Sequence, residues 1–524
     1  MMALTRVLNS RASRRVRVPA GPLILGGLIA TFSAPAYAGE PWLAPGNLQA
    51  RHDLELLVDG GVINIPMSQW PISVADLWVA LSSVDDDAHG AAGSGHPALT
   101  AAQSAALTRL RALTDTKPVL FVQARAAARP EELRTFWDEP RDAYEGTVGA
   151  AGFLGDYFGG RIELTVVDSP ADGDNFQPDG SYIAALAGNW IITLGYQDRW
   201  WGSGWQNSLI LSNNARPVPA IAIDRARSTP FESKWLRWIG PWRLTTFLGY
   251  MDEERGDYDH PLLFGFRVTA RPFPDWIQGL EIGIERTAQF CGEGRSCDWN
   301  DFWNLWWGND NAGENVNPKD EPGNQLAGTD LRWSSPIGNW PYAIFWQHTG
   351  ETIDNKIPRP YRSMDLYGVE FWGDFEDGAS WRANLEYANT LCSGTQDGLT
   401  LWDCAYNSGI YDAQGYRYKY RVMGASMDGD GLQYAARLLY VPSSGSTWNF
   451  MVRYTELNRG GAVNNIQNYV APGPENWWSF DVSYRRPLSR GWIELGVGAD
   501  DEDRLWNDTS AFLPRATLTW SREF

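Results

Sequence analysis

The sequence predicts an all-β transmembrane barrel of about 18 antiparallel strands, preceded by a small N-terminal α-helical periplasmic domain. The first reason is a strict alternation of residue types: in 278–286, Leu280, Ile282 and Ile284 alternate with glycine and glutamate. A strand of this kind has one apolar face and one polar face. The same alternation returns at 262–271, 381–387 and 448–454. Strands that are apolar outside and charged inside suit a wall between lipid and a polar interior.

The second reason is segment 1–38, which is typical of a secretory signal peptide. It holds five arginines, then the apolar stretch 23–32, then Ala36-Tyr37-Ala38, so we expect cleavage before Gly39. A single anchoring helix is the alternative, but the apolar run is about half of the roughly 20 residues that a spanning helix needs.

The third reason is where the long connections of the predicted barrel, 118–524, would fall. Rising strands are expected near residues 119, 159, 190, 241, 277, 341, 379, 447 and 491, and falling strands near 145, 181, 218, 262, 326, 363, 431, 477 and 513. The long insertions 128–144, 197–217, 287–325, 390–430, 456–476 and 500–512 then lie on the outer side. Outer-membrane barrels have this asymmetry. Residues 416–424 are assigned to a loop, because counting them as a strand would invert the later topology.

Ahead of the barrel, apolar residues recur at helical spacing, which predicts a periplasmic helical bundle over 39–117. The first helix should end at Gly60-Gly61. Two further helix starts are marked by capping boxes, Ser73 with Asp76 and Thr100 with Gln103.

The end of the chain and its outward faces bear on the same prediction. Phe524 resembles the terminal aromatic signal of outer-membrane assembly, so the barrel-assembly machinery is an expected partner, although Arg522 interrupts the alternation. A soluble β-sandwich or propeller is the alternative fold. Its outward faces should be polar, whereas here they carry Leu, Phe, Trp and Ile.

Composition excludes one class of partner and suggests another. Loss of the signal peptide would change the formal net charge from −19 to about −24, which makes nucleic acid a poor partner. The 28 Trp suit both membrane-interface girdles and sugar-stacking surfaces.

The four cysteines form two close pairs in an exported chain, which predicts two local disulfides, Cys291 with Cys297 and Cys392 with Cys404. A metal site would need more sulfur or histidine nearby, and the chain has only five His.

The densest unusual stretch is 198–219, which contains Arg199-Trp200-Trp201-Gly202 and Ser212-Asn213-Asn214-Ala215-Arg216-Pro217. Together with 53–63 and Trp70-Pro71, it resembles the capsule assembly Wzi family, and the resemblance covers essentially the whole mature chain. It implies an eighteen-stranded barrel capped by a periplasmic helical bundle, acting as an outer-membrane lectin that holds capsular polysaccharide on the cell surface.

Polysaccharide capture needs flat apolar plates for sugar C–H faces and fixed polar groups for hydroxyls or carboxylates. The candidates in this stretch are Arg199, Trp200, Trp201, Trp205, Asn213, Asn214 and Arg216. The alternative is that these residues fold the loop into the barrel mouth, with Arg216 paired to a luminal acid.

A second aromatic cluster lies in the largest outer loop, 289–325, and comprises Trp299, Trp303, Trp306 and Trp307. Trp299, Trp303 and Trp306 recur at helical spacing. Exposed, they would form a glycan platform; otherwise they form a short amphipathic helix that packs on its own barrel.

Inward-facing charges of both signs are expected along the strands, because an Arg turned to lipid at the midplane costs about 2 to 4 kcal/mol. They are Arg267, Arg271, Arg382, Arg437, Arg453, Glu281, Glu285, Glu386 and Glu494. Such an interior either closes by ion pairing or lines a conducting pore. The resemblance favours the closed form, and a channel for saccharides or ions is the alternative function.

No cofactor is expected. Acidic runs at 85–87, 428–430 and 500–503 offer oxygen ligands, yet none has the spacing of a calcium loop, so solvated loop charge is the preferred interpretation. Calcium bridging to an acidic polymer stays open. No Gly-x-Ser-x-Gly elbow or His-Glu-x-x-His helix occurs, and a Ser/His hydrolase at His348 is the only enzyme considered, so a non-enzymatic protein is predicted.

Overall fold

The computed structural model describes residues 39–89, 99–114, 117–307, 323–338, 340–353, 360–392, 402, 404–461 and 468–524. The predicted signal peptide lies outside these residues. So do the side chains of Trp307 and of the acidic run 85–87.

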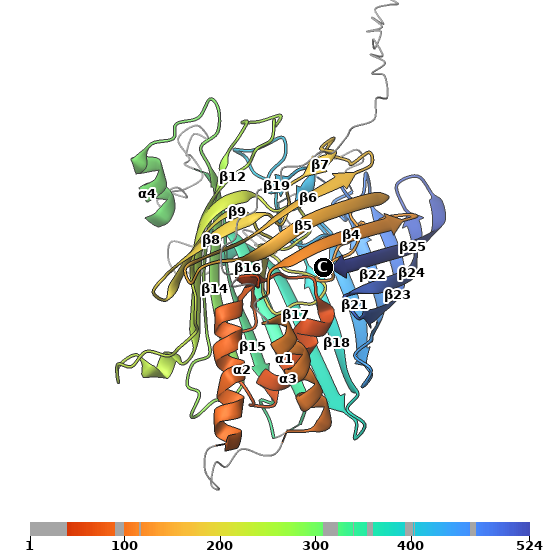
Figure 1. Cartoon of the computed structure of the whole chain (residues 1–524). Coiled ribbons are helices and arrows are strands. Elements are labelled where there is room, and N and C mark those ends of the chain that lie inside the picture. The colour runs from red at the N-terminus through yellow and green to blue at the C-terminus, as the bar shows by residue number, and fades with distance from the viewer. Residues whose placement is uncertain are drawn as a thin grey trace, which may run out of the picture. The chain divides into compact units, whose positions relative to one another are not determined.

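Within the described residues, eighteen long strands and one two-residue strand close into an antiparallel barrel (Figure 1). The strands are β4 (Val119–Ala127), β5 (Tyr144–Leu154), β6 (Phe158–Val167), β7 (Phe176–Gln177), β8 (Tyr182–Ala187), β9 (Trp190–Tyr196), β11 (Pro219–Arg225), β12 (Trp242–Tyr250), β13 (Leu262–Ala270), β14 (Leu280–Phe290), β15 (Gly323–Ser334), β16 (Tyr342–Ile353), β17 (Pro360–Asp374), β18 (Ser380–Asn389), β21 (Leu432–Val441), β22 (Thr447–Leu457), β23 (Glu475–Leu488), β24 (Gly491–Arg504) and β25 (Thr509–Glu523). Each follows its neighbour around the wall, and β25 pairs with β4 to close it. The predicted fold class is confirmed, and every predicted strand start lies within a few residues of an observed one.

The alternation of residue types sorts the side chains between the two faces of the wall. In β14, Glu281 and Glu285 are buried, whereas Ile284 is exposed on the outward face. Glycines on the inward face make room for inward aromatic rings. A Cβ on Gly265 of β13 would lie 2.1 Å from the ring of Phe247 in β12.

The two ends of the barrel differ. Short turns and the N-terminal helices share one end, called here the helical end, and the long connections leave the other, called the long-loop end (Figure 1). The predicted loop 500–512 is wrong, because β24 and β25 continue through it to a turn at 505–508. The acidic residues there keep the strand alternation, and Asp500 and Glu502 point inward onto Arg129 at 2.9 and 2.8 Å.

The N-terminal helices are α1 (Leu48–Asp59), α2 (Val74–His89) and α3 (Ala101–Leu113). Gly60 caps the end of α1, and Thr100 and Gln103 form the predicted capping box at α3. The box predicted at Ser73 is wrong: its hydroxyl has no hydrogen-bond partner among the described residues, and Asp76 instead accepts from the backbone N–H of Ser228 at 2.7 Å. No helix among the described residues is long and apolar enough to cross a bilayer.

The helices and the barrel share one hydrophobic core. Leu54 of α1 and Leu110 of α3 pack in the same buried cluster as Ala343, Trp372 and Leu439 of the wall. Two of the three short sheets that lie off the barrel wall in the described residues pair β1 (Trp42–Leu43) with β3 (Ile72–Ser73) and β19 (Arg417–Tyr418) with β20 (Arg421–Val422). Segment 416–424 is therefore not a wall strand, as predicted.

Candidate functional site

The interior of the barrel is occupied by two segments that pair with each other. β2 (Gln69–Trp70), from the N-terminal region, forms a two-stranded sheet with β10 (Trp200–Trp201), from the loop that follows β9. Phe136 packs edge-on against Trp70 and Trp200, with ring centroids 5.1 and 5.4 Å apart. An aromatic core thus lies where a porin would have water.

Carboxylates of the wall hold both segments in place. Glu386 of β18 accepts the backbone N–H groups of Trp205 and Asn207, each at 2.8 Å, and that of the residue between them at 3.1 Å. Glu281 of β14 likewise accepts from the N–H groups of Met67 and Ser68 at 2.9 and 2.7 Å. Because a buried backbone donor without a partner is costly, these acids fix the path of irregular chain through the interior.

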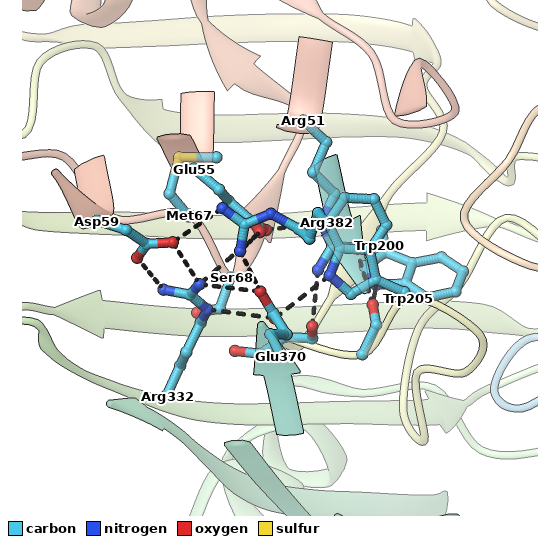
Figure 2. Close-up of polar contacts among 12 residues, drawn as sticks. Arg51, Glu55, Asp59, Met67, Ser68, Trp200, Trp205, Arg332, Glu370 and Arg382 are labelled. Atoms are coloured by element: carbon cyan, nitrogen blue, oxygen red, sulfur yellow. Dashed lines mark hydrogen bonds and ion pairs between the residues drawn. The ribbon is translucent and has the colours of Figure 1, made fainter. Parts of the chain in front are cut away.

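A charge cluster joins α1 to the wall and to the inserted loop (Figure 2). Arg332 of β15 and Arg382 of β18 both bind Asp59 of α1, at 2.7 and 3.0 Å, and both bind Glu370 of β17. Arg382 also lies 3.1 Å from Glu55 of α1. Ion pairs therefore connect the helix directly to β15 and β18, and through their arginines to β17.

Arg51 extends this cluster into the loop. Its guanidinium bonds to Glu55 at 2.9 Å, donates to the carbonyls of Ser203 and Gly204 at 2.6 and 2.8 Å, and stacks 4.0 Å from the ring centroid of Trp205 (Figure 2). Since α1 stands at the helical end and the loop starts from the long-loop end, the two ends of the barrel are joined through this arginine.

Three acids of this cluster lie close enough together to be compared with a cation site. Single carboxylate oxygens of Glu55, Asp59 and Glu370 lie within 4.8 Å of one another. Three arginines, Arg51, Arg332 and Arg382, already balance their charge, so the donor set suits ion pairing better than a metal. Burial and the nearby charge of Glu370 raise the pKa of Glu55 to about 7.

The residues that the sequence singles out in 198–219 are brought together, but inside the protein. Trp200, Trp201 and Trp205 are at most 1% exposed. Arg199 is also buried, with its guanidinium 4.4 Å from the ring of Phe247. These rings offer no face to a polymer in this structure, so the alternative, a loop folded into the barrel mouth, describes them correctly.

The remaining candidates of that stretch are also engaged internally. The side-chain amides of Asn213 and Asn214 donate to the carbonyls of Phe136 and Val422 at 3.3 and 2.9 Å. Arg216 forms a bidentate pair with Asp179 at 2.8 and 3.0 Å and a further pair with an acid of the preceding outer loop. Arg216 is thus paired to acids of an outer loop, whereas the alternative expected a luminal acid.

The second aromatic cluster forms α4 (Trp299–Trp307), which lies beside the outward face of the wall (Figure 1). Trp306 packs edge-on against Phe264 and Phe266 of β13, at 5.6 and 5.8 Å. Both phenylalanines have the outward parity of their strand. Trp299 and Trp303 point away from this contact and are exposed.

Other predicted groups have clear placements. The disulfides Cys291–Cys297 and Cys392–Cys404 are confirmed. Asp428, read as solvated loop charge, is instead buried on Arg417. His348 bonds Asp365 at 2.9 Å, and the two residues are partners on adjacent strands, on the outward parity of the wall.

Sequence reasoning missed an exposed feature at the long-loop end. β19 and β20 form a hairpin with a two-residue turn, Lys419 and Tyr420, whose φ angles are 49° and 65°. Such a turn normally takes Asn-Gly, because both central residues need positive φ. Tyr420 is half exposed at the tip, and its ring lies edge-on to that of Tyr469 at 6.2 Å. The feature that marks this turn is a pair of bulky residues at positive φ, and those φ angles are known only from the structure.

The chain is similar to known proteins in both sequence and structure. The profile of the family described as capsule assembly protein Wzi matches residues 138–510. The chain belongs to the capsule assembly Wzi family. It is 28% identical over 487 residues to a Klebsiella pneumoniae protein described as an uncharacterized 55.8 kDa protein in cps region, covering 91% of this chain and 90% of the relative.

A solved structure supports the fold. It is that of Wzi, an outer membrane protein involved in group 1 capsule assembly in Escherichia coli and described as a carbohydrate-binding β-barrel. The TM-score is 0.77 with 23% sequence identity, over 93% of this chain and 100% of the other. The part matched to the Wzi family includes the inserted loop and the β19–β20 hairpin, and it begins after the N-terminal helices.

Proposed function

We propose that this protein is a non-enzymatic outer-membrane lectin that binds capsular polysaccharide and retains it on the cell surface. Membership of the capsule assembly Wzi family and likeness to a barrel described as carbohydrate-binding support the proposal. In this arrangement lipid surrounds the wall, the N-terminal domain over 39–117 faces the periplasm and the long loops face outward. The barrel-assembly machinery inserts the chain.

The observation that carries the site is the strained tip of the β19–β20 hairpin. A non-glycine residue held at positive φ costs on the order of 1–3 kcal/mol, and such strain is concentrated at functional positions. Here the strain presents the ring of Tyr420 to solvent beside Tyr469. Beneath the tip, Arg417 and Tyr418 are buried, so the exposed ring stands on a fixed base.

Two exposed tyrosines of this kind suit a sugar polymer. Their faces pack against sugar C–H groups and their hydroxyls exchange hydrogen bonds with sugar hydroxyls. The neighbouring cations are engaged: Lys419 bonds Asp174 at 2.9 Å, and Arg421 bonds Glu132 at 3.1 Å. The site therefore offers rings and ion pairs rather than a free positive patch.

The sharpest test replaces the strained tyrosine by glycine. Tyr420→Gly removes the ring and relieves the positive φ, so glycan binding should fall at least about fivefold while the free energy of unfolding changes by less than about 1 kcal/mol. Lys419→Gly is the matched control, since it relieves the same kind of strain and keeps the ring. Binding to purified capsular polysaccharide, with and without calcium, is the measurement, and equal binding by both variants would contradict this site.

A cellular test separates retention from synthesis. A deletion strain should still make and export the polymer but shed it into the medium, which fractionation of cell-bound and free polymer measures. Polymer left unmade would assign the protein to synthesis or export instead.

The alternative function, a channel for saccharides or ions, is tested in a planar bilayer. The paired β2 and β10 segments and the ion-paired wall argue for no steady current through the purified protein. A stable open conductance would favour the channel.

A further inference from the structure

A row of aromatic side chains crosses the outward face of five neighbouring strands. Register places Tyr367 opposite Tyr387, Tyr387 opposite Tyr434, Tyr434 opposite Tyr454, and Tyr454 opposite Trp478. Three of these four contacts have ring centroids 6.3, 5.2 and 5.1 Å apart. The row is therefore an aromatic ridge across β17, β18, β21, β22 and β23, with one pair, Tyr434 and Tyr454, aligned by the strand register alone.

Three of the four tyrosine hydroxyls in the row point the same way along the wall. Tyr367 and Tyr454 donate to Asp365 and Glu456 at 3.4 and 3.5 Å, and the Tyr387 hydroxyl accepts from the amide of Asn389 at 3.3 Å. Each of these partners lies two residues closer to the long-loop end. The polar tips thus face the loops and the apolar ring bodies face the middle of the wall, as tyrosines do at a membrane–water boundary.

Against this ridge lies an apolar groove of about 550 Å³. Two residues along the strands from the tyrosines, the register places Ala436 between Leu385 and Val452. The small side chain of Ala436 forms the floor of the groove between these two larger side chains. The exposed, outward side chains of its lining are Tyr367, Leu385, Tyr434, Ala436, Val452 and Trp478. The groove is continuous with the apolar outer wall, which faces lipid in the proposed membrane location.

We propose that this groove binds an acyl chain of the outer-leaflet lipopolysaccharide, with the tyrosine hydroxyls at the level of its polar head. This inference rests on the outer-membrane location proposed above. A slender chain can lie on the recessed floor beside the aromatic ridge, whereas the convex wall of a second barrel would contact mainly the ridge. The interior face of the same strands is filled, so the groove is available only from the lipid side.

The test fills the groove. Protein extracted from outer membranes is stripped of lipid, and purified lipopolysaccharide is then added and bound lipid counted by native mass spectrometry. Ala436→Trp should weaken binding of the most tightly held lipid at least about tenfold. Ala383→Trp is the matched control, because it makes the same change at an outward alanine of β18 outside the groove.

Folding and glycan binding are measured on the same samples. Heat-modifiable migration should be unchanged in both variants, and so should binding to capsular polysaccharide, which separates this inference from the lectin site. Equal lipid retention by all three proteins would overturn the proposal. Loss of cross-linked dimers in Ala436→Trp, with lipid retention intact, would overturn it in favour of an interface between two copies.

Discussion

The loop 197–218 and the helix α4 are both rich in tryptophan, and both resemble sugar-binding platforms in the sequence. The structure separates them: Trp205 of the loop is 0% exposed inside the barrel, whereas Trp299 of α4 is 69% exposed outside it. Tryptophan content alone therefore does not indicate which surface is offered to a ligand.

The backbone explains the difference. The loop is irregular, so its N–H groups need partners, and Glu386 supplies them from the inner wall. A helix satisfies its own backbone except at its ends, so α4 can lie on the apolar outer wall. Arg286, on the outward parity of β14, donates to the carbonyl of Trp306 at 2.7 Å and thereby caps the end of that helix.

The largest expected effect contrasts the two tryptophans directly. Trp205→Ala should lower the free energy of unfolding by about 3–5 kcal/mol, since it empties a fully buried site. Trp299→Ala should change it by less than about 0.5 kcal/mol. Thermal or denaturant unfolding in detergent measures both. Similar losses in the two variants would erase the distinction between the regions.

The next effect tests what holds the loop inside. Glu386→Ala leaves three buried backbone N–H groups without an acceptor and should cost about 3 kcal/mol or more. If the loop is released from the interior, the barrel should also admit ions, which a planar-bilayer measurement would detect as new current. Glu386→Gln is the control, because it retains an acceptor oxygen. If the alanine variant is as stable as the parent, Glu386 does not anchor the loop.

A smaller, local effect is expected at α4. Trp306→Ala removes its contacts with Phe264 and Phe266 and should loosen the helix by about 2 kcal/mol, which raises its rate of limited proteolysis roughly 30-fold. Global unfolding should stay unchanged. Asn304→Ala, on the exposed side of α4, is the control and should leave cleavage at the parent rate.

The smallest effect concerns pH. Burial raises the pKa of Asp198, at the start of the inserted loop, to about 6. An acid whose folded pKa exceeds its unfolded pKa favours the folded state when protonated, so its contribution to stability should rise as pH falls from about 7 to about 4. Asp198→Asn should flatten that part of the stability profile. An unchanged slope would show that another group titrates there.

Much of the wall was predictable because its signal is local. A strand that separates lipid from a polar interior must alternate, so residues 278–286 reveal a strand without knowledge of its neighbours. The Thr100 capping box and the two disulfides are likewise short-range. The strands near 491 and 513 were predicted, but the loop expected at 500–512 was wrong, because its acidic residues were interpreted as loop charge whereas inward arginines pair with part of them.

The fate of the loops was not predictable, because it depends on distant partners. Trp205 is 181 residues from the Glu386 carboxylate that fixes its backbone. Asp76 does not form the predicted capping box, because its carboxylate instead accepts a hydrogen bond from Ser228, 152 residues away. The residue types of Lys419 and Tyr420 do not indicate a strained turn, so the exposed tip can be identified only from the structure.

The pairing of β2 with β10 has a consequence for traffic across the membrane. Strands entering from opposite openings meet midway, where a threading polymer would have to break their hydrogen bonds and the ion pairs around them. For the lectin proposed above, a capsule chain held at the rim would therefore reach the cell exterior by a route outside this barrel.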